Sequence, residues 1–344
     1  MKPVLLIDFG STYTKLTAVD VEGESLLGTA AAYTTVQTDI NDGLQKALRL
    51  LEEKTGKLEY DATYACSSAA GGLRMVTSGL VPELTGEAAR LASLGAGAKV
   101  EKVYNFQLTE DDLQEIANSK PDIFLLVGGT DGGNTACILH NAQMLSQLEP
   151  EFPVVIAGNR SAARQCQRYL EGRETFVCEN VMPKFGQLNI EPAQSQIRAL
   201  FLRRIIQAKG LSRASELISG IMMPTPSAVL QAMNLLAQGC EDERGIGDLV
   251  AVDVGGATTD IYSIADGMPE QMNTVFKGLP EPYAKRTVEG DIGMRYSIHG
   301  IVEAAGLQRI AKLSGLSEDR VTQLVAELRQ HTDKVPGGDA ELES

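Results

Sequence analysis

The chain contains no tryptophan, and aromatic residues make up only 5% of it. Proteins that bind single-stranded nucleic acid without sequence preference stack the bases on aromatic side chains. The formal net charge of −14 argues in the same direction, because phosphate groups of nucleic acids and anionic lipids attract basic surfaces. We therefore expect neither a nucleic acid nor a membrane as a partner.

Histidines and closely spaced cysteines are also scarce. The three histidines, His140, His299 and His331, are too scattered in the sequence for a metal cluster or a catalytic triad. The five cysteines lie far apart with no CxxC pair, which favours reduced thiols in the cytosol. No apolar run approaches the length of a membrane span, and the first run, Val4–Ile7, is too short for a signal peptide. These absences predict a cytoplasmic protein.

The chain of 344 residues is long enough for two or three domains. The start predicts strands that alternate in hydrophobicity and a helix over 41–54. Continuous apolar runs over 122–127, 153–158 and 175–178 alternate with helical segments, which indicates a parallel sheet covered on both faces. We divide the chain into a first lobe (1–84), an inserted parallel α/β module (85–186), a helical segment that completes the first lobe (187–248) and the start of a second lobe (249–344).

One short pattern occurs twice, 245 residues apart. An apolar strand runs into a turn at Asp8-Phe9-Gly10-Ser11-Thr12, and Lys15 follows in the returning strand. The second copy is Asp253-Val254-Gly255-Gly256-Ala257-Thr258-Thr259-Asp260. A plain hairpin is the alternative for either copy alone, since Gly, Ser, Thr and Asp are common turn residues. Two matched copies favour a phosphate chain held from both sides of a cleft.

The residue types in these two turns suit a nucleotide phosphate site. Glycine lets backbone N–H groups approach phosphate oxygens closely, and hydroxyls and a lysine add donors. An Asp in an apolar strand is costly unless it is paired or binds a metal, so Asp8 and Asp253 are candidate catalytic residues and Mg²⁺ ligands. The candidate phosphate-binding residues are Gly10, Ser11, Thr12, Lys15, Gly255, Gly256, Thr258 and Thr259.

The paired turns resemble the two phosphate signatures of the actin, sugar kinase and heat-shock chaperone ATPases. The stretch from Asp8 to Lys15 has the Asp-to-Lys spacing of actin-like members. This resemblance implies an α/β, two-lobed, actin-like (ribonuclease-H-like) ATPase fold that binds ATP and Mg²⁺ between its lobes. The small-molecule kinases share this fold, so phosphate transfer to an acceptor is the alternative to hydrolysis.

A second resemblance extends over most of the chain. The segments that carry it are 121–134, Ala157-Gly158-Asn159-Arg160, Glu179-Asn180-Val181-Met182-Pro183 and 285–295. In these segments the sequence is similar to the family of accessory proteins encoded with adenosylcobalamin-dependent glutamate mutase, the glutamate mutase MutL type. That resemblance implies an ATP-dependent reactivating or chaperone-like factor whose partner is the mutase.

Two further groups of residues are candidates for the site or its partner. Gly290 and Asp291 precede a helix predicted from Met294 to Ala305, and its N-terminus is expected to face the nucleotide or to be capped by Asp291. Asp131, Asn134, Asn159 and Asn180 follow the ends of predicted parallel strands. They form either a polar pocket that recognises the mutase or its cobalamin, or ordinary loop structure.

A third signature of these ATPases, a late strand followed by a glycine-rich turn that holds adenosine, is not found. After Asp260 the sequence predicts strands over 261–264 and 273–276 and then helices. We therefore expect a truncated second lobe. Either the chain is a piece of a longer protein, or this member has lost nucleotide binding and is a nucleotide-free interaction protein.

Overall fold

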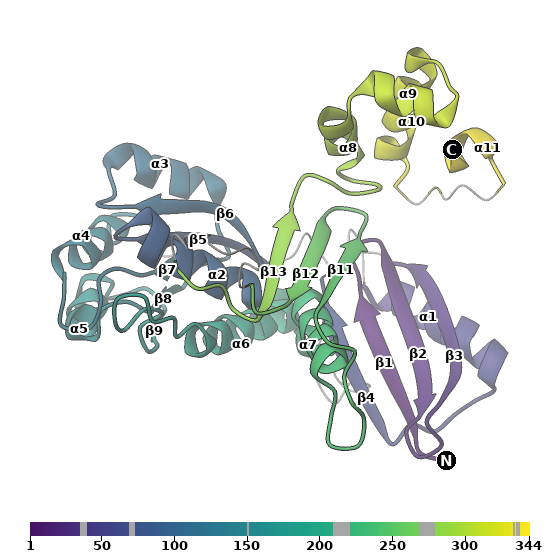
Figure 1. Cartoon of the computed structure of the whole chain (residues 1–344), viewed down its shortest axis with the longest axis horizontal. Helices are drawn as coiled ribbons and strands as arrows, with labels where there is room; N and C mark the ends of the chain where they lie inside the picture. Colours follow the sequence, from purple (N-terminus) through teal and green to yellow (C-terminus); the bar gives the residue numbers. More distant parts are fainter. Residues whose placement is uncertain are drawn as a thin grey trace, which may run out of the picture.

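The computed structural model describes residues 1–34, 40–68, 73–149, 151–208, 221–267, 279–332, 334 and 338–344. The described strands form three sheets, two of five strands and one of three. In Figure 1 the first sheet and the sheet of the inserted module stand at opposite ends, and the three-stranded sheet lies between them. None of the described helices is both long enough and apolar enough to cross a membrane.

The first sheet has the strand order β10-β4-β1-β2-β3. The strands β1, β2 and β3 are antiparallel neighbours, whereas β4 and β10 run parallel to β1. This order, with three antiparallel strands followed by two parallel ones, is the ribonuclease-H-like arrangement that the sequence predicts. The strands are β1 Pro3–Phe9, β2 Tyr13–Asp20, β3 Ser25–Tyr33, β4 Ala62–Ser67 and β10 Ile221–Pro224.

Helix α1 (Ile40–Thr55) covers this sheet and confirms the predicted helix over 41–54. Its buried residues Leu44, Ala47 and Leu51 recur at helical spacing and pack with Leu16 of β2. The strand β2 alternates between buried and accessible side chains, as a strand covered on one face does. Packing against α1 therefore holds the first sheet, and with it the turn between β1 and β2, in position.

The helical segment predicted over 187–248 also contains a strand, at Ile221–Pro224, that the sequence analysis missed. Helices α6 (Glu191–Ala208) and α7 (Thr225–Gln238) occupy most of it, but β10 lies directly before α7 and pairs with β4. A strand of four residues has too little periodicity to be recognised. Its Pro224 is tolerated because β10 is the edge strand of the sheet.

The inserted module has a fully parallel sheet of order β6-β5-β7-β8-β9, as predicted. Successive residues of its strands enter two separate cores: Met75 and Leu125 pack on one face, and Val76 and Phe124 pack on the other. The strand β5, which the sequence analysis missed, lies before residue 85. The strands are β5 Leu73–Gly79, β6 Ala98–Asn105, β7 Ile123–Leu126, β8 Val154–Ile156 and β9 Thr175–Val177.

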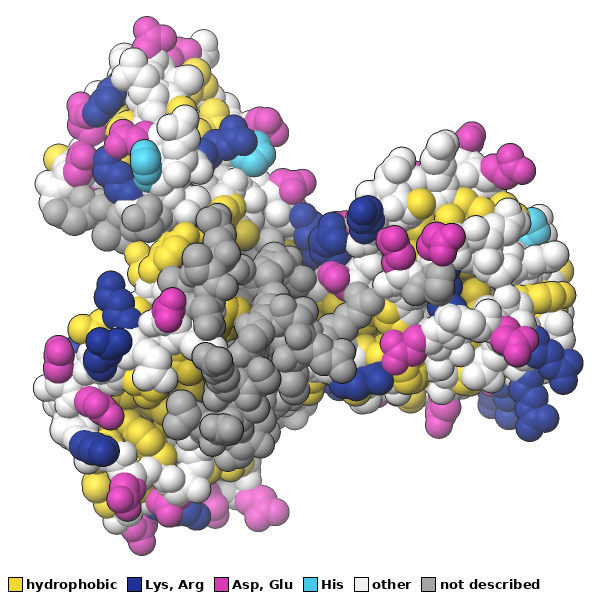
Figure 2. Space-filling view, turned by 180° about the vertical axis from the view of Figure 1, so that it is seen from behind, with side chains coloured by type: hydrophobic (Ala, Val, Ile, Leu, Met, Phe, Trp, Pro, Cys, Tyr) yellow, Lys and Arg dark blue, Asp and Glu magenta, His cyan; other side chains and the backbone are white. Residues whose placement is uncertain are grey.

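Helices follow the strands of the module on both faces of its sheet (Figure 1). A π-helical turn over Pro82–Gly86 leads into the first of them. In space-filling form the module projects from the rest of the molecule (Figure 2). The helices are α2 Glu87–Gly95, α3 Glu110–Ser119, α4 Ala136–Leu145 and α5 Arg160–Tyr169.

The third sheet contains β11 (Leu249–Val254), β12 (Thr259–Ile264) and β13 (Ala284–Glu289), all antiparallel. It repeats the arrangement of β1, β2 and β3. The strand β13 was missed because its sequence, Ala-Lys-Arg-Thr-Val-Glu, is too polar to resemble a buried strand. The strand predicted over 273–276 lies outside the described residues.

After β13 the described elements are four helices, which form a separate group at the top of Figure 1. Helix α8 begins at Ile298, four residues later than predicted, and Ser297 rather than Asp291 precedes it. The segment 290–297 is instead packed on the second turn, as described below. The helices are α8 Ile298–Ala305, α9 Leu307–Ser314, α10 Glu318–Gln330 and α11 Ala340–Glu343.

Candidate functional site

The two repeated turns have the same backbone geometry. In the first, Gly10 N donates to Tyr13 O over 3.1 Å; in the second, Gly255 N donates to Thr258 O over 2.9 Å. In each hairpin the Asp pairs with the residue seven positions later, which is Lys15 opposite Asp8 in the first turn. In the second turn the corresponding pair is Asp253 and Asp260. The repeat in the sequence is thus a repeat in structure.

The glycines of these turns are required by close approaches of the backbone. A Cβ atom on Gly10 would lie 2.6 Å from Tyr13 O, within the turn itself. A Cβ atom on Gly256 would lie 2.3 Å from Thr12 Oγ1, which belongs to the other turn. The second contact shows that the two turns meet, although they are far apart in the sequence.

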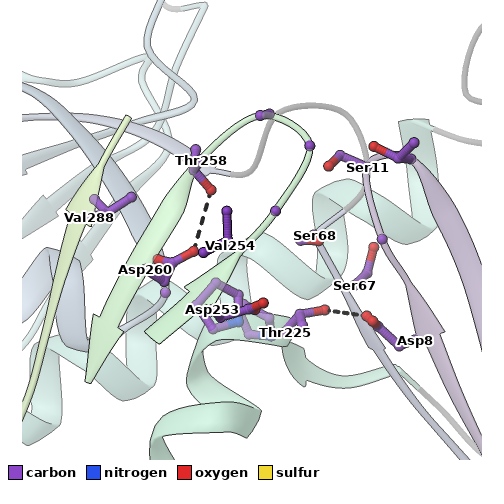
Figure 3. A pocket seen from close by; sticks show the side chains of 18 of the residues that line it. Asp8, Ser11, Ser67, Ser68, Thr225, Asp253, Val254, Thr258, Asp260 and Val288 are labelled. Carbon is purple, nitrogen blue, oxygen red and sulfur yellow. Dashed lines mark hydrogen bonds between the residues drawn. The ribbon is translucent and has the colours of Figure 1, made fainter. Parts of the chain in front are cut away.

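One cleft lies between the two turns (Figure 3). Thr12 is buried in it, and its Oγ1 has no hydrogen-bond partner in the part of the chain that the structure describes. A buried hydroxyl without a partner is costly, so it favours an incoming hydrogen-bonding group. The predicted residues that line the cleft are Asp8, Gly10, Ser11, Thr12, Lys15, Asp253, Gly255, Gly256 and Thr258.

Asp8 is held by three neighbours. Thr225 Oγ1, at the start of α7, donates to Asp8 Oδ1 over 2.8 Å (Figure 3). Cys66 Sγ lies 3.5 Å from the same oxygen, and Lys15 Nζ lies 3.5 Å from Asp8 Oδ2. Burial, followed by the charge of Asp8, raises the pKa of the Cys66 thiol to about 12, so it remains a protonated donor. The Asp8 carboxylate is therefore fixed in orientation before any ligand binds.

Asp253 has a different environment. Its side chain is exposed to the cleft, and desolvation by the surrounding protein raises its pKa. Lys15 lowers this pKa, whereas Asp260 and Asp8 raise it. Two carboxylates from opposite turns thus act on each other across the cleft, an arrangement that a cation would stabilise.

Asp260 and Arg286 form a buried ion pair beside the second turn, which the sequence analysis missed. Their exposed fractions are 6% and 4%, and Arg286 Nε donates to Asp260 Oδ1 over 2.7 Å. Thr258 Oγ1 donates to Asp260 Oδ2 over 3.3 Å (Figure 3). The one signal available in the sequence was that Asp260 stands where the first turn has Lys15.

Three of the predicted residues do not line the cleft. Thr259 Oγ1 donates to Ile292 O over 3.0 Å, away from it. Gly290 and Asp291 lie beside Lys99 of β6, and the Asp291 side chain is 90% exposed.

Met294 and Arg295 lie against the cleft in place of Gly290 and Asp291. Their backbone N–H groups donate to Gly255 O and Gly256 O, each over 2.9 Å. The segment after β13 therefore supports the second turn through its backbone. The structure adds Ser67, Ser68, Gly97, Lys99, Thr225 and Pro226 to the cleft lining.

The polar loops of the inserted module are ordered by internal hydrogen bonds. Asn159 is fully buried and bonds the backbone of Gly132 and Gly133. Asn180 donates to Gly129 O and to Asp131 Oδ1, and Asn134 Oδ1 accepts from Cys137 N. These contacts support the ordinary loop interpretation over the pocket interpretation.

The cleft fits a nucleotide phosphate with Mg²⁺. Among the described residues no three or more His, Cys, Asp or Glu side chains gather as a metal cluster. Mg²⁺ does not need one, because it keeps several waters and binds one or two carboxylates together with substrate phosphates. Asp8 and Asp253 would supply those carboxylates, and the glycine backbones and Thr12 Oγ1 would face the phosphates.

The strand order of the first sheet and the paired turns define an α/β protein of the actin-like class. Comparison with known proteins identifies the family. The sequence profile of the family described as MutL protein matches residues 4–344. Protein MutL of Clostridium tetanomorphum is 52% identical over 316 residues, which cover 91% of this chain and 68% of that protein. The chain belongs to the MutL family.

Solved structures give weaker likenesses. A xylulose kinase from Bifidobacterium adolescentis matches with a TM-score of 0.29 and 14% identity, over 94% of this chain and 69% of the kinase. A short-chain flavodoxin associated with a bacterial microcompartment matches with a TM-score of 0.30 and 14% identity, over 38% of this chain and 97% of the flavodoxin. The strand order and the paired turns, rather than these scores, carry the fold assignment.

Proposed function

We propose that this protein is an ATP-dependent reactivating factor for adenosylcobalamin-dependent glutamate mutase in the cytoplasm. Membership of the MutL family supports the choice of partner. The observation that carries the ATP site is the contact between the two turns, where Gly256 lies against Thr12 and each turn presents an Asp at the matching position.

Each turn has its own part in holding the nucleotide. Gly10, Ser11, Thr12 and Lys15 bind the β-phosphate side, and Gly255, Gly256 and Thr258 bind the γ-phosphate. Thr259 supports the second turn through its bond to Ile292 O. Asp8 and Asp253 would hold Mg²⁺ and would orient the attacking water. When bound, the cation neutralises charge that develops on the transferred phosphoryl group.

Hydrolysis changes how strongly the two lobes are held together. The first lobe contains the sheet β10-β4-β1-β2-β3, and the second lobe starts with β11–β13. ATP contacts both turns, so loss of the γ-phosphate loosens the closed arrangement. The inserted module passes this change to the mutase, and damaged cobalamin is released.

A reactivation assay tests this function. The purified protein is added to a glutamate mutase inactivated with a damaged cobalamin, with Mg-ATP, Mg-ADP or no nucleotide, followed by fresh adenosylcobalamin. We expect recovery of mutase activity with Mg-ATP only, together with release of phosphate to water. The Asp8→Ala variant serves as the control and should give no recovery. Equal recovery in all three nucleotide conditions, or none, would refute the proposal.

A further inference from the structure

One corner of the inserted module reaches the cleft. This corner, residues 94–99, joins the end of α2 to the start of β6. Gly97 adopts a φ of +92° there, and a Cβ atom on it would lie 2.8 Å from Pro224 Cβ at the end of β10. The corner is thus pressed against the first lobe, and Gly97 and Lys99 line the cleft.

A fixed contact ties the corner to the second turn. Arg286 Nη1 donates to Leu94 O over 3.2 Å and to Ala98 O over 2.9 Å. The same guanidinium is paired with Asp260, which accepts the hydroxyl of Thr258 from the turn. All these charged groups are buried, and breaking a buried pair by removing one partner is strongly destabilising. The buried pair thus ties the corner to the second turn more firmly than a surface contact would.

A second contact is weaker and can be released. The Lys99 side chain lies across Gly290, where a Cβ atom would be 2.5 Å from Lys99 Cε. Lys99 Nζ is 3.5 Å from Gly290 O and 3.6 Å from Asp291 Oδ1. An ion pair with a carboxylate that is 90% exposed contributes little, because solvent screens it.

A polyphosphate in the cleft offers Lys99 a stronger partner. It carries more negative charge than Asp291, whose carboxylate is 90% exposed to solvent. Lysine is a common phosphate ligand, and its long side chain can move between two acceptors. Lys15, from the first turn's returning strand, lies with its Nζ 3.5 Å from Asp8 Oδ2.

We propose that Lys99 is a phosphate-binding residue that the inserted module contributes to the cleft, and that a nucleoside triphosphate draws it away from Asp291. Arg286 keeps the corner attached to the second turn, while Lys99 exchanges Asp291 for the nucleotide. The position of the Lys99 side chain in the module therefore depends on whether the γ-phosphate is present. This inference rests on the proposed ATP site and adds to it the residue through which the module senses ATP.

Binding of Mg-ATP and Mg-ADP to the wild type, Lys99→Gln and Lys102→Gln tests it. Lys102 is a matched control, since it lies on the same strand and pairs with Glu115 outside the cleft. We expect Lys99→Gln to lose about ten-fold in ATP affinity and much less in ADP affinity, as for one charged hydrogen bond. Lys102→Gln should match the wild type. Asp291→Asn, which frees Lys99, should bind ATP at least as tightly as the wild type.

Hydrogen exchange of residues 94–105 provides a readout in the module itself. In the wild type, saturating Mg-ATP should slow exchange there, and in Lys99→Gln it should not, even when the site is filled. An unchanged ratio of ATP to ADP affinity in Lys99→Gln would overturn the role of Lys99 while leaving the ATP site intact. Failure of the wild type to bind ATP would instead overturn the proposed function.

Discussion

At the scale of single residues, the two matching aspartates, Asp8 and Asp253, have different surroundings. Asp8 accepts a hydrogen bond from Thr225 and faces Lys15, so its position is set by protein groups. Asp253 is exposed to the cleft and lies near other carboxylates, with a raised pKa. The carboxylate of the first turn is therefore held in one orientation, whereas the ionised form of the second is destabilised by its surroundings.

Replacing Asp253 by Asn should raise the stability of the folded protein and weaken its binding of Mg-ATP. Because burial raises the folded-state pKa of Asp253 above its ordinary value, its ionised form lowers stability above that folded pKa. This cost disappears as the pH falls below the unfolded pKa. Asp253→Asn should therefore be more stable than the wild type at about pH 7, with a smaller difference at about pH 4. Urea unfolding at both values checks this.

The same variant should lose Mg²⁺-dependent ATP binding, since an amide is a poorer ligand for a hard cation. A variant that is less stable than the wild type at neutral pH would contradict the environment described for Asp253.

Thr225 offers a second test at this scale. Thr225→Ala removes the hydroxyl that orients Asp8, and a hydrogen bond to a charged group contributes about 1.5–3 kcal/mol. We expect Mg-ATP affinity to fall by about ten-fold or more. Thr225→Ser keeps a hydroxyl and should restore most of it. Equal affinities in the Ala and Ser variants, measured by calorimetry, would show that the hydroxyl is unimportant.

The sequence alone predicted the residues inside the two turns. It did not predict the residues elsewhere in the chain that hold those turns in position. Asp8, Thr12, Asp253 and Gly256 belong to local patterns whose chemistry can be recognised in one stretch of chain. Thr225 is 217 residues from the Asp8 that it orients, so only the folded chain brings them together. Nothing in the sequence around Thr225 shows which carboxylate its hydroxyl would meet.

At the scale of elements, the two hairpins act as one unit because their turns touch. Helix α1 and the apolar strands β7, β8 and β9 of the module were predicted within a few residues. The strands β5, β10 and β13 were not: β10 is short and ends in a proline, and β13 is polar. Their positions depend on pairing with strands already in place, which is a tertiary effect.

The contact between the turns can be tested by a double-mutant cycle. Gly256→Ala places a Cβ atom 2.3 Å from Thr12 Oγ1 and should destabilise the protein by about 1–3 kcal/mol, as overpacking does. Thr12→Ala removes the obstructing atom, so the double variant should recover much of that loss. Denaturant unfolding of the four proteins measures the coupling. Additive losses would mean that the two turns do not touch.

At the scale of the whole molecule, two features of the described residues bear on association with a partner: the inserted module and the edge strand β11. The inserted module projects from the body, so it is accessible to a large partner (Figure 2). The strand β11 is at the end of its sheet, and no other described strand pairs with its outer edge. Its side chains Val250 and Val252 are 69% and 59% exposed. An exposed apolar edge strand favours association between chains.

We therefore predict that this chain associates as its concentration rises, and that Val252→Lys reduces the association. A lysine on an edge strand opposes pairing with another strand. Val21→Lys is the matched control, because Val21 is also exposed but follows a strand whose two edges are paired. Sedimentation velocity over a concentration series provides the measurement. An equal effect of the two lysines would rule out β11 as the contact.

The central claim is that the two turns form one Mg-ATP clamp, and calorimetric titration of Mg-ATP tests it most directly. The wild type should show saturable binding at one site. Asp8→Ala should bind roughly ten-fold more weakly or worse, because it removes the oriented carboxylate. Omitting Mg²⁺ should weaken ATP binding by the wild type. It should change ATP binding by Asp8→Ala only slightly. No binding to the wild type, or equal affinities for the two proteins, would contradict the claim.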